Sequence, residues 1–447
     1  MKHQSLESFM EHLTAKVGHQ PEYIQAATEI MESLWPFVTK NPHYAEQALL
    51  ERLVMPERTI IFSVPWLDDR NEVQLNRGYR VQHNSAIGPY KGGIRFHPSV
   101  NLSIMKFLAL EQTLKNSLTT LPMGGAKGGA DFDPKGKSQF EIMRFCQAFI
   151  RELFRHIGPD TDVPAGDIGV GGREVGFMAG MMKKLTNRAD CVFTGKGASF
   201  GGSLIRPEST GYGLVYFAQE MLKQKGMSFD GRRVSISGSG NVSQYAIEKA
   251  ISLGAKVITA SDSSGTIIDE AGFTTEKLAI LMQIKNVEYG RISEYAKRVG
   301  ATYHPGVRPW NVKVDVALPC ATQNELDEID AAALIKNGAV CVAEGANMPT
   351  TFAATKLFEE HGTMFGPGKA SNAGGVTTSG LEMSQNAMRL SWTRDEVDQK
   401  LQSIMHSIHE SCLKYGRLPN GQLSYLTGAN VAGFVKVADA MLAQGVL

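Results

Sequence analysis

The sequence predicts an α/β fold of two domains, the second of them built on a doubly wound parallel sheet. Three observations lead to this prediction. The 447 residues are too many for one ordinary hydrophobic core, which favours two domains. Residues 233–260 alternate strand, glycine turn, helix and strand. Further short apolar strands, at 314–318 and 340–343, are separated by helical segments, as in a parallel sheet with crossover helices.

The N-terminal half is expected to combine helices with a strand pair. Apolar residues on one helical face predict a docked helix at the start of the chain: Leu6, Phe9, Met10, Leu13 and Val17. Residues 59–67 and 73–82 alternate apolar and polar side chains around a polar turn, which is typical of paired strands. Helical periodicity predicts the remaining elements, which lie within 20–56, at 102–118 and at 139–157.

In the second half, a β-α-β unit is the most regular pattern. A strand at 233–237 runs into Gly238-Ser239-Gly240, a helix follows over 242–253, and a second strand covers 256–260. Long helices return at 394–415 and 428–444. The change of pattern places the domain boundary near residue 200.

Composition narrows the function classes. The 46 Lys and Arg residues balance 45 Asp and Glu, which argues against nucleic acid or an anionic membrane as the main partner. No apolar run approaches the roughly 18 residues of a membrane span, and the charged N-terminus lacks the apolar core of a secretory signal. Five scattered cysteines without a C-x-x-C pair indicate a reducing compartment, so we expect a cytoplasmic protein. His406 and His409 lack partners for a metal site, and we expect none.

The turn after the strand at 233–237 has the pattern of a dinucleotide-binding site. It fits G-x-G-x-x-G/A with Ser243 in the third position. The glycines permit a tight turn and let a pyrophosphate approach the backbone, while the helix N-terminus offers free N–H groups to the phosphates. The alternative is a purely structural turn. The residues predicted to contact the coenzyme here are Gly238, Ser239, Gly240, Asn241 and Val242.

The choice between NAD and NADP depends on the end of the next strand. Asp262 stands there, 24 residues after Gly238, where an acidic residue favours a free ribose hydroxyl. However, serines surround it, Ser263 among them, and Lys285 and Arg291 follow, so a 2′-phosphate could also be held. A solvated helix face explains the two cations equally well.

Glycine and lysine are clustered in a way that indicates a ligand site. Residues 88–213 hold 21 of the 46 glycines, which suggests backbone lying close to a small ligand. Four lysines stand in or near this stretch at Lys91, Lys115, Lys127 and Lys196. A lysine that is partly desolvated there would have a depressed pKa, useful in catalysis, although a basic surface loop is the alternative. Asp167, in a proline- and glycine-bounded loop, could exchange a proton with a substrate or simply cap a helix.

Seven motifs in chain order make the sequence recognisable. They are GPYKGGIRFHPSVN (88–101), LPMGGAKGG (121–129), DVPAGDIGVGGREVGFM (162–178), RPESTGYG (206–213), PCATQNEL (319–326), EGANMPTT (344–351) and NAGGVTTSGLEMSQN (372–386). Over essentially its whole length the chain resembles the hexameric glutamate dehydrogenase family, particularly the small-subunit bacterial and fungal type.

The resemblance implies a role for each matching position. Lys91 would hold the side-chain carboxylate of glutamate or 2-oxoglutarate, with Ser379 contributing from the other domain. Gln112 and Lys115 would bind the α-carboxylate, and the Gly166 backbone would contact the substrate. Lys127 would be the catalytic lysine and Asp167 the proton donor and acceptor. The residues that would contact the coenzyme are Thr210, Asn241 and Asn347, together with Asp262, Ser263 and Lys285.

The resemblance also implies an architecture and a reaction. The active site would lie in a cleft between a substrate-binding and oligomerisation domain, residues 1–200 with the helix 427–447 packing back on it, and a Rossmann-like dinucleotide-binding domain, residues 201–426. The chain would form a homohexamer that oxidatively deaminates L-glutamate to 2-oxoglutarate and ammonia, reversibly, with NADP preferred over NAD. In reverse the enzyme would assimilate ammonia. The alternatives are another amino-acid dehydrogenase of the same superfamily and a non-catalytic, ligand-sensing homologue.

Overall fold

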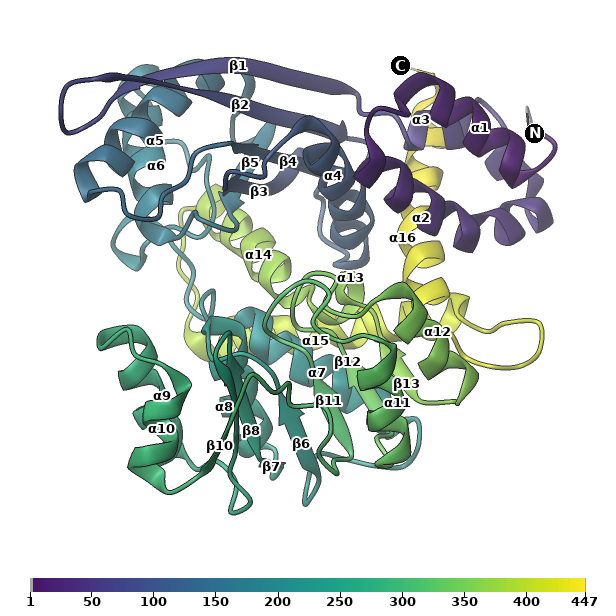
Figure 1. Cartoon of the computed structure of the whole chain (residues 1–447). Helices are drawn as coiled ribbons and strands as arrows, with labels where there is room; N and C mark the ends of the chain where they lie inside the picture. Colours follow the sequence, from purple (N-terminus) through teal and green to yellow (C-terminus); the bar gives the residue numbers. More distant parts are fainter. Residues whose placement is uncertain (1–2, 447) are drawn as a thin grey trace. The chain divides into compact units, whose positions relative to one another are not determined.

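The computed structural model describes residues 3–446, which form two compact units (Figure 1). The first unit holds the chain up to Leu204, Val376–Val397 and the segment from Asn430 onward. The second holds Ile205–Gly375 and Asp398–Ala429. Residues 376–397 were included in the predicted range 201–426, yet they pack with the first unit.

The first unit contains a mixed five-stranded sheet in the order β1-β2-β4-β3-β5. Strand β1 pairs antiparallel with β2 along the whole length of β1, and β4 continues antiparallel on β2. Strand β3 then lies parallel to both β4 and β5, so these three strands end at the same edge. The strands are β1 (Arg58–Leu67), β2 (Val73–Asn84), β3 (Tyr90–Phe96), β4 (Gly125–Ala130) and β5 (Asp162–Gly166).

Two groups of helices cover this sheet. Helices α5 and α6 pack on each other and enclose an aromatic core that includes Phe96, Phe132, Phe145 and Phe149. Helix α4 contacts β2 and β4, and α2 packs on α4. The helices of the N-terminal segment are α1 (Leu6–Val17), α2 (Pro21–Lys40), α3 (Leu49–Leu53), α4 (Leu102–Leu118), α5 (Gln139–Leu153) and α6 (Gly172–Thr186), with 3-10 turns at Pro42–Ala45, Phe154–His156 and Ala198–Phe200.

The second unit is a doubly wound sheet. Its five parallel strands run in the order β13-β12-β11-β6-β7. The chain starts at β6 and proceeds to β7 on one side and to β11 on the other, so the strand order reverses between β6 and β11. Ligands of such sheets bind at the carboxyl ends of the strands at this point. The strands are β6 (Arg233–Ile236), β7 (Lys256–Val257), β11 (Val316–Leu318), β12 (Cys341–Ala343) and β13 (Met364–Gly366).

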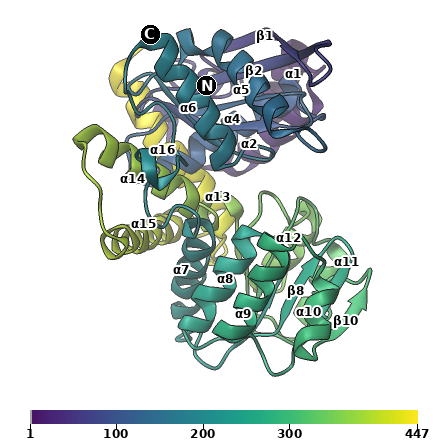
Figure 2. The ribbon, with the colours of Figure 1, turned by 90° about the vertical axis from the view of Figure 1, so that its left-hand side faces the viewer.

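Helices lie on both faces of this sheet. Helices α7, α8 and α9 pack side by side (Figure 2), and α7 contacts β12 and β13. Helices α11 and α12 pack together over a core that includes Trp310, Leu334 and Phe358. The helices are α7 (Ser209–Lys223), α8 (Asn241–Ser252), α9 (Thr275–Met282) with a π-helical extension at Gln283–Val287, α10 (Ile292–Val299), α11 (Glu328–Lys336), α12 (Phe352–Glu360) and α13 (Gly368–Ser371).

Three long helices complete the chain, α14 (Gly374–Met388), α15 (Arg394–Tyr415) and α16 (Tyr425–Gln444). The predicted α/β class with a doubly wound second half is confirmed, and the helices predicted at 102–118 and 394–415 have those bounds. The strand predicted at 256–260 is instead divided. Strand β7 ends at Val257, and β8 (Thr259–Asp262) leaves the parallel sheet to form a small antiparallel sheet with β9 (Gly265–Ile268) and β10 (Thr302–Pro305). No helix within residues 3–446 is long and apolar enough to cross a membrane.

A buried lysine on α4 lowers the stability of this fold. Lys106 is 5% exposed, and its Nζ atom lies 4.2 Å from the centre of the Tyr23 ring on α2. Among the described residues, no carboxylate pairs with it. Burial therefore lowers the pKa of Lys106 to about 8. Because the folded chain resists protonating a lysine that is readily protonated when unfolded, the cost is fully present below pH 8 and fades as the pH rises towards the unfolded pKa.

We expect Lys106→Met to raise the free energy of unfolding at pH 7 by about 1–2 kcal/mol, after allowance for the lost cation–π contact. The gain should shrink towards zero at pH 10. Urea denaturation at pH 7 and pH 10, at one protein concentration, measures the change in the free energy of unfolding. Lys16→Met, on the exposed face of α1, is the control. A variant less stable than the parent at pH 7 would contradict this account of Lys106.

Candidate functional site

Three charged side chains meet at the edge of the first sheet where β3, β4 and β5 end. Asp167 directly follows β5, and Lys127 lies within β4. Lys127 Nζ is 2.7 Å from Asp167 Oδ1, and Arg95 Nε is 2.7 Å from Asp167 Oδ2. The side chains are 5%, 11% and 12% exposed for Lys127, Asp167 and Arg95. The carboxylate is therefore held between two cations and largely shielded from water.

This arrangement shifts the pKa values of Asp167 and Lys127. Burial alone would raise the pKa of Asp167, but the attraction and hydrogen bonds of Lys127 and Arg95 outweigh it, so the pKa lies well below its usual range. Burial lowers the pKa of Lys127; the carboxylate of Asp167 opposes this effect and the charge of Arg95 adds to it. Both pKa values are therefore lowered, and the hydrogen-bonded pair, 2.7 Å apart, places an ionised carboxylate beside a lysine that gives up its proton more readily than usual.

Sequence reasoning brought Lys127 and Asp167 together but missed Arg95. The alternation of apolar residues around Arg95 could have indicated it. Arg95 stands in a strand between Ile94 and Phe96, both fully buried, so the alternation of β3 puts the guanidinium on the opposite face from that core.

The glycines of these strands allow segments of the protein to approach one another. A Cβ atom at Gly93 would lie 2.7 Å from the carbonyl oxygen of Gly166 and 2.9 Å from Cβ of Asp167. A Cβ atom at Gly128 would lie 3.0 Å from Cδ of Arg80, whose buried side chain donates to the Gly92 carbonyl and pairs with Asp162 at the start of β5. At these positions the glycine crowding expected to face a ligand instead lets the charged side chains pack.

Helix α4 carries further predicted substrate residues beside β3. Lys91 is 1% exposed near the start of β3, and its backbone carbonyl accepts a hydrogen bond of 3.0 Å from Asn116 Nδ2. The Asn116 amide also donates to the Gly124 carbonyl and accepts from Gln112 Nε2 at 2.6 Å. Gln112 and the half-buried Lys115 are three residues apart, so they share one face of α4.

Ser379, which is 1% exposed, lies on the part of α14 that belongs to the first unit, not in the second unit as the predicted ranges had it. A Cβ atom at the neighbouring Gly380 would contact Leu121 and Met123, so α14 packs against the segment that leads into β4. Gly166, the last residue of β5, immediately precedes Asp167.

Lys196 does not join the charged group but fixes α14. Its Nζ atom donates to the Phe193 carbonyl at 2.5 Å, to Glu382 at 2.7 Å and to Asn386 at 2.7 Å. Glu382 also accepts from the Gly195 N–H. With three acceptors and 9% exposure, this lysine is a structural cation.

The predicted glycine turn lies at the strand-order reversal of the second unit. Gly238 has φ of +81°, which a side chain rarely adopts, and its N–H donates to Ser261 Oγ at 2.7 Å. Ser243 Oγ donates to the Ser237 carbonyl at 2.8 Å, so a small residue is needed at this third position. Helix α8 begins at Asn241 after Gly240, which has no side chain to cap the helix, and no described atom would lie within 4 Å of a Cβ atom there. This N-terminus suits a phosphate.

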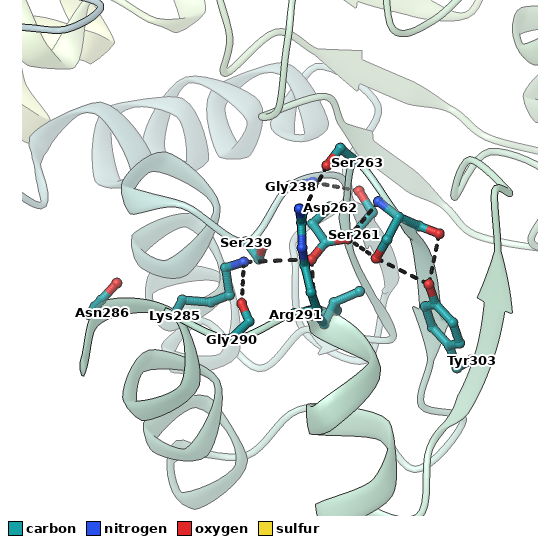
Figure 3. A network of polar contacts seen from close by, with 12 residues as sticks. Gly238, Ser239, Ser261, Asp262, Ser263, Lys285, Asn286, Gly290, Arg291 and Tyr303 are labelled. Carbon is teal, nitrogen blue, oxygen red and sulfur yellow. Dashed lines mark hydrogen bonds and ion pairs between the residues drawn. The ribbon is translucent and has the colours of Figure 1, made fainter. Parts of the chain in front are cut away.

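Asp262 is the last residue of β8, and both oxygens of its carboxylate already accept hydrogen bonds from neighbouring groups (Figure 3). Its Oδ1 atom accepts from the N–H and hydroxyl of Ser264, and its Oδ2 atom accepts from the Ile292 N–H at the start of α10. Burial would raise the pKa of Asp262, but these hydrogen bonds and Lys285, whose Nζ is 3.6 Å away, lower it.

Cations gather around this turn. Arg291 Nη1 donates to Ser263 Oγ at 2.9 Å, and Lys285 Nζ also donates to the Gly290 carbonyl. Figure 3 shows both cationic side chains directed towards the turn at Asp262 and Ser263. Ser263 and Arg291 are exposed, so the network is open to solvent.

Comparison with known proteins identifies the family. The model for Glu/Leu/Phe/Val dehydrogenase, dimerisation domain, matches residues 56–184, and that for Glutamate/Leucine/Phenylalanine/Valine dehydrogenase matches residues 201–445. The chain belongs to the Glu/Leu/Phe/Val dehydrogenase family. The family and fold predicted from the motifs are confirmed.

Relatives of this dehydrogenase chain span its whole length. An NADP-specific glutamate dehydrogenase of Salmonella typhi is 67% identical and covers 99% of both chains. An NAD-specific glutamate dehydrogenase of Bacteroides fragilis is 57% identical over 99% of this chain and 100% of its own. The crystal structure of Plasmodium falciparum glutamate dehydrogenase superposes with a TM-score of 0.96 at 50% identity, covering 98% of this chain and 94% of that one.

The remaining residues that were predicted to contact the coenzyme lie at separate places in the second unit. Thr210 lies on α7, and Asn241 Nδ2 donates to the Pro207 carbonyl just before that helix at 2.6 Å. Val242 is half-buried in the first turn of α8, Ser239 is buried in the glycine turn, and Asn347 is exposed in the loop after β12.

Proposed function

We propose that this chain catalyses the reversible oxidative deamination of L-glutamate to 2-oxoglutarate and ammonia with NADP as coenzyme. The observation that carries the chemistry is the buried contact of Lys127 and Arg95 with Asp167. The substrate and coenzyme are supported by the full-length NADP-specific relative at 67% identity. The test is an assay of the purified chain with glutamate and each coenzyme. The absence of glutamate-dependent NADP reduction would overturn the proposal.

The substrate is a dicarboxylate, so its site needs more than one cation. Lys91 binds the side-chain carboxylate together with Ser379, while Gln112 and Lys115 bind the α-carboxylate. The Gly166 backbone contacts the substrate beside the catalytic pair. Lys91 is almost fully buried, so its ammonium strongly favours a substrate that brings a second carboxylate. That preference argues against the alternative of a branched or aromatic amino acid as substrate.

The catalytic pair handles protons and water. The coenzyme, when bound, would supply the acceptor for the hydride of the substrate Cα. Asp167 takes a proton from the substrate nitrogen, and Lys127 assists the attack of water on the resulting iminium carbon and stabilises the developing negative charge on oxygen. Asp167 then returns its proton to the nitrogen. The hydroxyl of the adduct releases its remaining proton to solvent as the carbonyl double bond forms, the carbon–nitrogen bond breaks and ammonia leaves. The low pKa of Lys127 suits this role, because a neutral amine can accept the proton of the attacking water.

The turn Gly238–Asn241 and the start of α8 would hold the coenzyme pyrophosphate. The ribose site favours a 2′-phosphate, because both oxygens of Asp262 are engaged by neighbouring N–H and hydroxyl groups, while Ser263, Lys285 and Arg291 offer donors. A 2′-phosphate would receive charge-assisted hydrogen bonds from these groups. Thr210 and Asn347 complete the coenzyme contacts.

We expect Arg291→Ala to lower kcat/KM for NADP by about 10- to 100-fold and to leave kcat/KM for NAD within about twofold, because NAD lacks the phosphate. Steady-state kinetics with each coenzyme at saturating glutamate measures the ratio. Arg298→Ala is the matched control, since Arg298 stands on α10 but pairs with Glu288. An equal loss for both coenzymes would contradict the assignment of Arg291.

The remaining parts of the proposal concern assembly and setting. The chain acts as a homohexamer in the cytoplasm, where the reverse reaction assimilates ammonia. Residues 1–200, the helix 427–447 and residues 376–397, which include Ser379 and pack in the first unit, bind substrate and support assembly, and the rest of 201–426 binds coenzyme. Light scattering that gave a monomer or dimer would overturn the hexamer. A non-catalytic, ligand-sensing role is the alternative. An inactive parent chain that binds glutamate would support it.

A further inference from the structure

Tyr289 is exposed and strained in a segment that the proposed reaction does not use. Its side chain is 85% exposed, more than any other large hydrophobic side chain among the described residues. Its φ is +55°, a left-handed conformation that is unusual for a bulky residue and that persists where surrounding contacts enforce it. Within residues 3–446, Tyr289 makes no hydrogen bond, ion pair or ring contact. Neither core packing nor an internal partner accounts for it.

The backbone around Tyr289 is held by the same cation that borders the ribose site. The chain leaves the π-helical turn Gln283–Val287, and the Gly290 N–H donates back to the Ile284 carbonyl at 2.8 Å. Lys285 Nζ donates to the Gly290 carbonyl at 2.9 Å (Figure 3). These two bonds close a loop over residues 284–290, with Tyr289 directly before the closing residue Gly290. Local π-helix of this kind is frequent at functional sites.

A second contact ties this loop to the glycine turn. Asn286 and Gln244 exchange hydrogen bonds of 3.0 Å through their side-chain amides. Gln244 also donates to the Ser239 carbonyl at 2.8 Å. The loop that carries Tyr289 is therefore joined to the turn proposed to bind the pyrophosphate at one end and to Arg291 at the other.

The covalent structure of the coenzyme relates these positions. In NADP the adenine base and the 2′-phosphate are attached to neighbouring carbons of one ribose, so whatever holds the phosphate lies beside the base. Tyr289 is two residues from Arg291, which limits their Cα atoms to about 7.6 Å apart. An exposed aromatic ring at that distance from a phosphate-binding cation can reach the face of a base.

We propose that Tyr289 stacks on the adenine base of the coenzyme, with the loop 284–290 as a preformed platform beside the phosphate-binding cations. The inference rests on the proposed NADP site and adds to it the recognition of the base. Stacking is indifferent to the 2′-phosphate, so Tyr289 supports NAD and NADP alike, whereas Arg291 separates them. The closed loop holds the backbone of Tyr289 in place before the coenzyme arrives, which reduces the entropy lost on binding.

The test is the affinity for adenosine 2′,5′-bisphosphate, measured by titration calorimetry on the full chain. We expect Tyr289→Ala to weaken binding by about 10-fold or more and Tyr289→Phe to stay within about twofold, since phenylalanine keeps the stacking face. Val287→Ala is the matched control, because Val287 is 62% exposed in the same loop but aliphatic. In steady-state kinetics, Tyr289→Ala should lower kcat/KM for NAD and kcat/KM for NADP by the same factor.

The outcomes separate this inference from the proposed function. An affinity loss below about twofold in Tyr289→Ala, or an equal loss in Val287→Ala, overturns the stacking role. A loss that follows a change in oligomeric state, seen by light scattering, also overturns it and assigns Tyr289 to a contact between copies. A parent chain that binds the bisphosphate through Tyr289 but does not oxidise glutamate with NADP refutes the proposed function and leaves the stacking role standing.

Discussion

Replacing Asp167 with asparagine is expected to lower kcat for glutamate oxidation by about 10³-fold, within the range for loss of a general acid–base group. The amide cannot take and return a proton in the proposed deamination. It also leaves Lys127 and Arg95 buried without their shared anion. Steady-state and single-turnover kinetics at saturating glutamate and NADP measure the loss, and coenzyme affinity should stay within about threefold because the glycine turn lies in the other unit.

The pH profile gives an independent check on the same variant. In the parent, the Asp167 carboxylate raises the pKa of Lys127 against the effects of burial and of Arg95. Without that charge, the pKa of Lys127 falls further, so the acidic limb of any residual activity should move to lower pH. Asp69→Asn is the control, since it removes a half-exposed partner of Arg144 in the same unit. Residual activity within tenfold of the parent would contradict the role of Asp167.

The second large effect is expected at Lys91. Replacing Lys91 with leucine should lower kcat/KM for glutamate by about 10³-fold, because the side-chain carboxylate would lose a buried cationic partner. The kcat/KM for a monocarboxylic amino acid such as norvaline should not fall, since norvaline has no side-chain carboxylate that could lose a cationic partner. The ratio of the two values is the measurement, and adding Ser379→Val should move it further in the same direction.

Lys115 supplies the internal control for this ratio. Both amino acids carry the α-carboxylate that Lys115 is proposed to bind, so Lys115→Leu should lower both values and leave the ratio nearly unchanged. An unchanged ratio in Lys91→Leu, or an equal shift in Lys115→Leu, would remove Lys91 as the residue that selects a dicarboxylate.

Local sequence patterns predicted several elements closely. Helix α4 was expected at 102–118 and has those bounds, because Asn101 caps its first turn and apolar residues follow a helical period. The strand pair at 59–67 and 73–82 corresponds to β1 and β2. The prediction of a single strand at 256–260 was wrong. A buried parallel strand and a buried antiparallel strand have the same apolar composition, so only the strands they pair with distinguish β7 from β8.

The candidate site was predicted in part. Lys127 and Asp167 stand out in the sequence because glycines and prolines surround them, although Lys127 lies inside strand β4 and Asp167 directly follows β5. Arg95 was missed, since its role depends on β3 lying parallel to β5, a long-range pairing that no local window contains. Lys196 has the same glycine-flanked setting as Lys127, yet its ammonium binds Glu382, which is 186 residues away on α14.

The sequence by itself determined the family, the β-α-β glycine turn and the identities of the ionisable residues, because these depend on short motifs whose backbone requirements are local. Only the tertiary structure decided which charges meet. Parallel pairing of β3 with β4 and β5 puts Arg95, Lys127 and Asp167 together, and the turn at Ser264 engages Asp262 beside Lys285. The physical reason is that a buried charge is defined by its partner, and the partner comes from a distant part of the chain.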